Sequence, residues 1–337
     1  MIRSARKKCD SYSSLFHPVR HVALVTCLFA PHVSAQQPGS PPIRDPSNPV
    51  VMLSVIVTDK SNHSVDDVSR DDLQVFEGGK LQKLQSFSRE EKPVKYTIAI
   101  DMSLSFKNLV GASLLAANLI ITQNRPEDET ALVRFISSDK INTEQAFTSD
   151  KSKLLEALKQ FYVDEGQSAV IDVVYLAVES TKSYKSEDPG ARRALVLISD
   201  GEDRHSYYSQ DALVKLLRRS NVQIFVIGMV SELDKDRGLM RASPRDRSEG
   251  FLKLLAQETG GRVFFPRNIG DLQAAAKEIA HDLHLQFSVG YELAEPGAKS
   301  FHKVEIKTVG QRQLTAITRS GYFGLSYTAK ENKKAAP

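Results

Sequence analysis

The stretch that decides the fold is 95-KYTIAIDMSLSF-106, in which an apolar run leads directly into a group of oxygen-bearing side chains. Residues 96–100 are apolar or β-branched, which is typical of a strand buried on both faces. Asp101, Ser103 and Ser105 then follow at alternate positions. A carboxylate and two hydroxyls on one short loop are hard oxygen donors of the kind that bind Mg²⁺. The same residues would also suit a strand end followed by serines that cap the next helix, so this stretch alone leaves both interpretations open.

Strand-like and helix-like segments alternate on the C-terminal side of this stretch, as far as about residue 285. Further apolar runs that resemble buried strands occupy 129–137, 192–200 and 222–230, and amphipathic segments lie between them. This alternation predicts an α/β fold with a doubly wound, mostly parallel sheet and helices on both faces.

Shorter β-like segments flank the α/β region at 50–92 and 287–327. Together they supply about six or seven strands, near the number in an immunoglobulin-like sandwich. We therefore expect one small, sandwich-like β domain formed from both flanks, with two separate β units as the alternative. The expected organisation is a signal peptide (1–35), a linker (36–49), an N-terminal β segment (50–92), the α/β domain (93–286), a C-terminal β segment (287–327) and a disordered tail (328–337).

The N-terminus has the order of a secretory signal. A basic start precedes the apolar stretch 22–30, and the small residues Val33 and Ala35 suggest cleavage after Ala35. We expect export to the periplasm, the cell surface or the medium, and a disordered tail is the alternative. We expect no apolar run to reach the roughly 18 residues of a membrane span, and so no transmembrane span after cleavage.

Charge and cysteine content both change when the leader is set aside. Residues 1–35 hold five basic residues and one acidic residue, a net charge of +4, which equals the +4 of the whole chain (45 basic and 41 acidic residues) and leaves the remainder neutral. A neutral chain argues against a nucleic-acid partner. Both cysteines, Cys9 and Cys27, lie in the leader. The folded part therefore has no thiols for disulfides, catalysis or a zinc site.

A second carboxylate follows the strand-like run 192–199, at Asp200, and Ser168 precedes a helix just behind Gly166. In a doubly wound sheet, ligands bind beyond the C-terminal ends of the strands, where the strand order reverses. Asp101 and Asp200 would share that edge if their strands are neighbours.

The pattern Asp-x-Ser-x-Ser, a later hydroxyl in a glycine-containing turn and the sequence SDGED resemble the von Willebrand factor type A domain over about 95–285. The resemblance implies a metal-ion-dependent adhesion site that holds one divalent cation, Mg²⁺ or Mn²⁺. Its implied ligands are Asp101, Ser103, Ser105, Ser168 and Asp200. Ser168 stands where the family usually has threonine, and Leu104 stands where glycine is common. The flanking β segments resemble the ends of a bacterial family of exported proteins related to this domain.

The function implied is that of an exported binding or adhesion-type protein, not an enzyme, whose cation captures an acidic group of a protein partner. Residues 231–250 read as a long charged loop on the same sheet edge, which is either a solvated loop or a partner contact. The expected partner contacts are Leu104, Arg237, Arg241 and Arg245. Two alternatives remain: an assembly scaffold with a non-functional metal site, and a metal-assisted hydrolase that uses the same oxygens.

Overall fold

The computed structural model describes residues 50–185, 188, 190–233, 242–293, 300–310 and 312–323. The predicted signal peptide, linker and tail lie outside these residues, as do Arg237 and Arg241.

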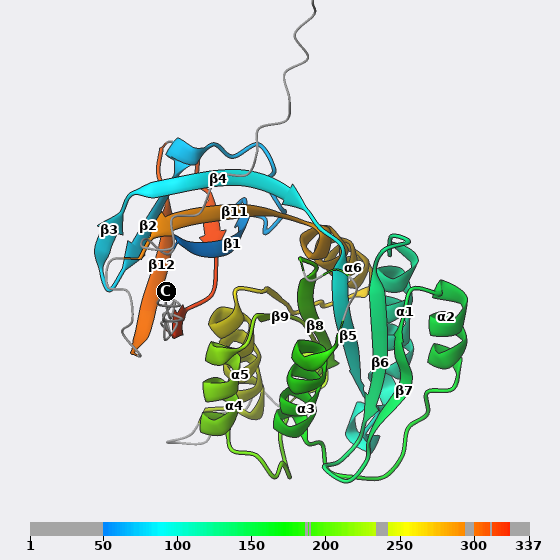
Figure 1. Cartoon of the computed structure of the whole chain (residues 1–337). Helices are drawn as coiled ribbons and strands as arrows, with labels where there is room; N and C mark the ends of the chain where they lie inside the picture. Colours follow the sequence, from blue (N-terminus) through cyan, green and yellow to red (C-terminus); the bar gives the residue numbers. More distant parts are fainter. Residues whose placement is uncertain are drawn as a thin grey trace, which may run out of the picture. The chain divides into compact units, whose positions relative to one another are not determined.

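A six-stranded sheet forms the centre of the α/β region (Figure 1). Its strands are β5 (Val94–Asp101), β6 (Glu129–Phe135), β7 (Ile141–Thr148), β8 (Arg192–Ser199), β9 (Val222–Gly228) and β10 (Val263–Phe264). They run in the order β10-β9-β8-β5-β6-β7, and all pairs are parallel except the antiparallel β6–β7 pair at one edge. The predicted doubly wound, mostly parallel α/β fold is confirmed.

Helices cover both faces of this sheet. They are α1 (Val110–Thr122), α2 (Lys151–Lys159), α3 (Val170–Ser183), α4 (Gln210–Arg219), α5 (Pro244–Thr259) and α6 (Ile269–His284). Helices α1, α2 and α6 share one hydrophobic cluster with the sheet, and α3, α4 and α5 share another. Every residue of β5 is buried, which explains why residues 96–100 are a continuous run of apolar or β-branched residues and not an alternating pattern.

Short polar signals set the helix ends. The side chains of Asp150, Ser209, Ser243 and Asn268 accept hydrogen bonds from the first turns of α2, α4, α5 and α6. Helix α5 begins at Pro244, so the expected loop 231–250 was too long at its C-terminal end. A serine followed by proline is a strong helix start, because proline at the first helical position gives up no hydrogen bond.

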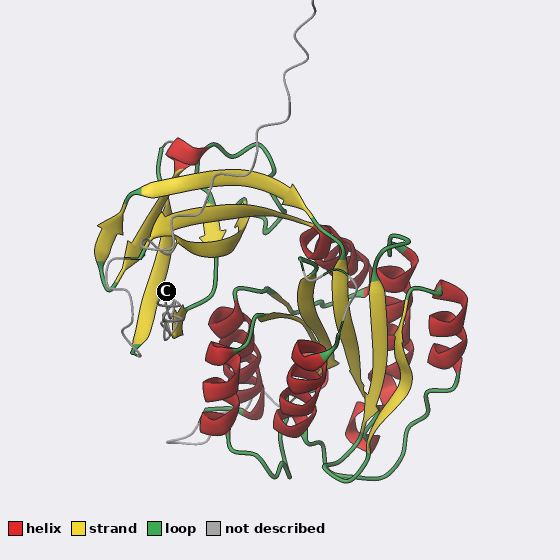
Figure 2. Ribbon diagram, in the orientation of Figure 1, coloured by secondary structure: helices red, strands yellow, loops and turns green. Residues whose placement is uncertain are grey.

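The flanking segments form two further four-stranded sheets (Figure 2). Their strands are β1 (Val50–Thr58), β2 (Leu73–Glu77), β3 (Lys80–Gln82), β4 (Leu84–Glu91), β11 (Leu285–Glu292), β12 (Phe301–Thr308), β13 (Thr315–Ile317) and β14 (Gly321–Phe323). The sheet orders are β13-β1-β11-β4 and β14-β12-β2-β3, so each sheet contains strands from both flanks. One hydrophobic cluster contains residues of both sheets. The two flanks therefore do not fold as separate units.

A buried ionic network joins the N-terminal flank to α6. Arg262 and Asp282 are 3% and 0% exposed and form an ion pair. The hydroxyl of Ser64 donates to Asp282 at 2.6 Å and accepts from Arg262 at 2.8 Å. This network fixes a loop of the flank against the last helix of the α/β region.

Among the described residues, one helical stretch is long and apolar enough to cross a membrane by length and composition, Leu104–Thr122. The prediction that no apolar run reaches this length is wrong for this stretch. The stretch combines a 3-10 helix (Leu104–Leu109) with α1, and the buried residues of α1 belong to the hydrophobic cluster under the sheet. A core helix passes the same test, so the finding is weak evidence for a membrane span.

Candidate metal centre

The strand order of the sheet reverses between β5 and β8. These two strands pair in parallel, with Ile100 opposite Ile198, so Asp101 at the end of β5 lies level with the end of β8. Asp200 comes directly after β8. The reversal point, where doubly wound sheets bind ligands, therefore carries both carboxylates.

The carboxylate of Asp101 is fully buried and is surrounded by hydroxyl and amide donors. Its Oδ1 accepts a hydrogen bond from the Ser103 amide at 3.0 Å. Its Oδ2 accepts hydrogen bonds from the hydroxyls of Ser168 and Ser199, each at 3.0 Å. The hydroxyls of Ser103 and Ser105 lie 3.2 Å apart. Four of the five implied ligands are thus connected through one hydrogen-bonded group.

The loop before α3 brings Ser168 to Asp101. Ser103 forms a parallel bridge with Asp164, which places this loop beside the loop that follows β5. Gly166 allows the approach, because a Cβ at this position would lie 2.6 Å from Cγ2 of the buried Ile136. The position of Ser168 therefore depends on the absence of a side chain two residues earlier.

The loop after β8 is folded by its own polar groups. Gly201 has a φ of +76°, and its amide donates to the Ser199 hydroxyl at 3.0 Å. The Glu202 amide donates to Asp200 Oδ1 at 2.9 Å, and Asp203 accepts from the first-turn amide of Ile171 in α3 at 3.0 Å. This loop is therefore tied both to the strand end and to the start of α3.

Burial dominates the electrostatics of the two carboxylates. It raises the pKa of Asp101, against the opposing effect of the hydrogen bonds from Ser103, Ser199 and Ser168. Asp200 is 3% exposed, and its burial, followed by the nearby charge of Asp101, raises its pKa to about 7. Neither carboxylate forms an ion pair with a described residue. Their ionised forms lack the compensation that a bound cation would supply.

The donor chemistry fits a small divalent cation. Within the described part of the chain, no group of three or more His, Cys, Asp or Glu side chains is placed to hold a metal, so serine hydroxyls would have to complete the ligand set. The hydroxyls of Ser168 and Ser199 donate to Asp101, and the Ser199 oxygen also accepts from the Gly201 amide, so the Ser168 oxygen is the one whose lone pairs remain for coordination. Hard oxygen ligands of this kind suit Mg²⁺.

The expected partner contacts have different outcomes. Leu104 is 50% exposed beside the buried Ser103, so its side chain reaches solvent. Arg245 lies in the first turn of α5 and forms an ion pair with Glu249 at 3.0 Å. Ser199 is not among the ligands predicted from the sequence, although this residue directly precedes Asp200. Its role follows from the β5–β8 register, which the sequence does not contain.

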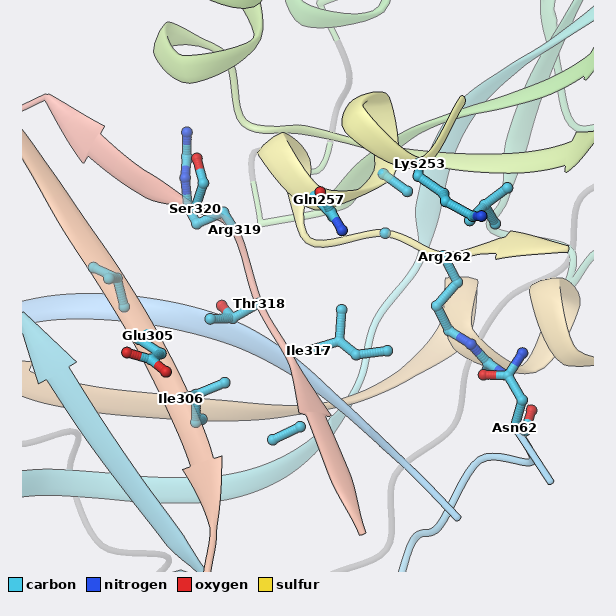
Figure 3. A pocket seen from close by; sticks show the side chains of 15 residues that line it. Asn62, Lys253, Gln257, Arg262, Glu305, Ile306, Ile317, Thr318, Arg319 and Ser320 are labelled. Carbon is cyan, nitrogen blue, oxygen red and sulfur yellow. The ribbon is translucent and has the colours of Figure 1, made fainter. Parts of the chain in front are cut away.

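A cavity of about 420 Å³ lies away from this group, between α5 with β10 and the strands β12 and β13 (Figure 3). Gln257 and Arg262 line one side, and Ile306, Ile317 and Thr318 line the other. Arg262 is already committed to Asp282, and its buried Nε has no hydrogen-bond partner among the described residues. The cavity shares no lining residue with the carboxylate group.

Comparisons with known proteins were made for sequence and for structure. No curated protein matches the chain at a significant level. An aerotolerance-related membrane protein from Bacteroides fragilis has a TM-score of 0.43 and 20% identity, over 56% of this chain and 98% of that chain. A von Willebrand factor type A protein from Catenulispora acidiphila has a TM-score of 0.43 and 11% identity, over 74% and 76%. Proximal thread matrix protein 1 from the mussel byssus, with a zinc-occupied MIDAS motif, has a TM-score of 0.45 and 15% identity, over 60% and 49%.

These similarities are too weak to transfer a ligand or a partner to this chain. The family model for the von Willebrand factor type A domain matches residues 97–278, which is more than half of the 337 residues. The match spans the sheet from β5 to β10 and contains both carboxylates of the candidate site. The chain therefore belongs to the von Willebrand factor type A domain family.

Proposed function

We propose that this protein is an exported binding protein that captures an acidic group of a protein partner through one divalent cation, Mg²⁺ or Mn²⁺. The residues that would hold the cation are Asp101, Ser103, Ser105, Ser168 and Asp200. The proposal places the partner at the sheet edge where β5 and β8 end.

The observation that carries the proposal is the buried carboxylate of Asp101, which two hydroxyls from distant segments approach at 3.0 Å each. A fully buried carboxylate is costly unless it is paired. Three neutral donors lower this cost, yet burial still keeps the pKa of Asp101 above its ordinary value. An arrangement that favours an ionised form only when a cation arrives is what a metal site requires.

The residues divide the work between them. Asp101 orients the hydroxyls of Ser168 and Ser199, and Ser105, which is exposed, marks the solvent side of the group. A bound Mg²⁺ would supply an electrophilic position that a carboxylate oxygen of the partner can occupy. Because only two of the five proposed ligands are carboxylates, their charge balances that of the cation without exceeding it, and the centre carries less negative charge than an all-carboxylate site.

Export is part of the proposal and rests on the sequence of residues 1–35, with its basic start, apolar stretch and small residues before position 36. The mature chain would act in the periplasm, on the cell surface or in the medium. The neutral charge beyond the leader supports a protein partner over a nucleic acid.

The proposal is tested with two short peptides that differ only in one residue, glutamate or glutamine, and with the purified protein. We expect the glutamate peptide to bind in Mg²⁺, and binding to disappear with a chelator or in Asp101→Ala. Equal binding of both peptides, or binding that survives chelation, would contradict the proposal. Turnover of simple esters or phosphates in Mg²⁺ would instead favour a hydrolase.

A further inference from the structure

The backbone of an arginine, Arg204, contacts a proposed metal ligand from the loop that follows β8. The backbone amide of Arg204 donates to the carbonyl oxygen of Ser168 at 2.8 Å. The hydroxyl of the same serine donates to Asp101. The backbone of Arg204 is therefore held in direct contact with a proposed ligand residue, independently of the conformation of the Arg204 side chain.

The side chain of Arg204 is 50% exposed and is only partly engaged. Among the described residues, its guanidinium donates one hydrogen bond, from Nη2 to the carboxylate of Glu202. A guanidinium has five N–H donors in a planar fork, so most of its donors remain for other acceptors. Besides Glu202, the charges of Asp200 and Asp101 also raise the pKa of Arg204, so the group lies within electrostatic reach of both carboxylates.

We propose that Arg204 is the second contact for the acidic group that the site captures, and that it makes the site selective for a carboxylate that can accept a forked pair of hydrogen bonds. This inference rests on the proposed function of the metal site. A partner carboxylate would then present one oxygen to the cation and the other to two adjacent N–H groups of the guanidinium fork, so that both of its oxygens are satisfied.

The physical argument is one of opposing charge effects. A cation close to a metal site repels the metal, so Arg204 lowers the affinity for Mg²⁺ when no partner is present. The same positive charge attracts an incoming carboxylate, and a forked hydrogen bond adds geometric selection that a point charge lacks. Removing Arg204 should therefore weaken partner binding without weakening metal binding.

The experiment measures two affinities for the wild type, Arg204→Gln and Arg204→Lys, by calorimetric titration. One titration uses Mg²⁺ alone, and the other uses the glutamate peptide in saturating Mg²⁺. We expect Arg204→Gln to weaken peptide binding by about tenfold, the equivalent of one hydrogen bond to a charged group, and to leave Mg²⁺ affinity equal or higher. Arg204→Lys should recover part of the loss, because it keeps the charge but not the fork.

A matched control is Arg267→Gln. Arg267 is also an exposed arginine, and its acidic partner is Asp271 of α6. The Arg267→Gln variant should leave both affinities unchanged. If the wild type binds Mg²⁺ and the peptide, and Arg204→Gln keeps peptide affinity within twofold, the role of Arg204 is overturned while the proposed function stands. Equal losses of Mg²⁺ and peptide affinity would overturn it as well, because they would indicate a structural role. A wild type that binds no Mg²⁺ would overturn both proposals.

Discussion

The Ser168 hydroxyl donates to the Asp101 carboxylate at 3.0 Å, although 67 positions separate the two residues in the chain. The bond joins the end of β5 to the loop before α3, at the point where the strand order of the sheet reverses. Its geometry leaves the carboxylate buried and the hydroxyl oxygen available to a further ligand.

The metal-free protein should lose stability as the pH rises, because of Asp200. The folded-state pKa of Asp200 is about 7, above the ordinary value of 3.8. Between these values the folded state binds more protons than the unfolded state, so the free energy of unfolding falls with rising pH and stays lower above pH 7. The full effect is on the order of 4 kcal/mol. Urea unfolding at several pH values, compared with Asp200→Asn, isolates this fall.

Saturating Mg²⁺ should remove most of this fall in the free energy of unfolding with pH, since a bound cation favours the ionised carboxylate of Asp200. Wild type and Asp200→Asn that show parallel pH profiles without metal would show that the Asp200 carboxylate is not held in a raised-pKa state.

Gly166→Ala should weaken Mg²⁺ binding and lower stability. An added Cβ would lie 2.6 Å from Ile136 Cγ2, so the loop that holds Ser168 must shift. Overpacking of this kind costs about 1–3 kcal/mol. Gly111→Ala is the control, because a Cβ at this second residue of α1 meets nothing within 4 Å, and the variant should be more stable by about 0.4–1 kcal/mol. Unchanged Mg²⁺ affinity in Gly166→Ala would argue against Ser168 as a ligand.

Most of the α/β fold could be predicted because its strands are buried on both faces, which makes continuous apolar runs such as 96–100. The switch between β5 and β8 could be expected only from the family resemblance. Pairing of β1 with β11 and of β2 with β12 joins residues more than two hundred positions apart, and no local pattern specifies such partners.

The candidate site could also be predicted only in part from the sequence. Asp101 and Asp200 are visible as carboxylates at strand ends, whereas Ser199 and Arg204 matter through register and loop folding. Ser199 meets Asp101 because β5 and β8 align, and Arg204 meets Ser168 through its backbone. Neither contact can be inferred from the type of residue alone. The start of α5 at Pro244 was readable from the Ser-Pro pair.

Asp282→Ala should strongly destabilise the protein, because it removes the fully buried acid paired with Arg262 and leaves only Glu278, at 3.3 Å, to compensate that buried guanidinium. Breaking a buried ion pair by removing one member costs about 3–5 kcal/mol. Asp271→Ala on the same helix removes an exposed pair with Arg267 and should cost only a small fraction of that. Denaturant midpoints of the two variants make the comparison, and similar losses would contradict the importance assigned to the buried network.

His281 should make a separate, alkaline contribution to stability. Its hydrogen bond to Asp282, followed by that to Asp66, raises its pKa from 6.5 to about 9. The stabilisation is fully present below pH 6.5 and is lost as the pH rises through 9, because the folded state holds the proton longer than the unfolded state. His281→Gln should abolish this part of the pH profile. If the stability of the wild type follows the same pH profile as that of His281→Gln between pH 6.5 and 9, the interactions of His281 with Asp282 and Asp66 contribute nothing to stability.

The most direct measurement of the central claim is thermal unfolding of the wild type and Asp101→Ala, each with Mg²⁺ and with a chelator. Asp139→Ala, which removes an exposed acid outside the proposed ligand set, is the control. A ligand that binds only the folded state stabilises it by about 2.7 kcal/mol at a hundredfold excess over its dissociation constant. We predict that Mg²⁺ raises the midpoint of the wild type and of Asp139→Ala but not of Asp101→Ala. No rise in the wild type at millimolar Mg²⁺ would contradict the metal site and the binding function built on it.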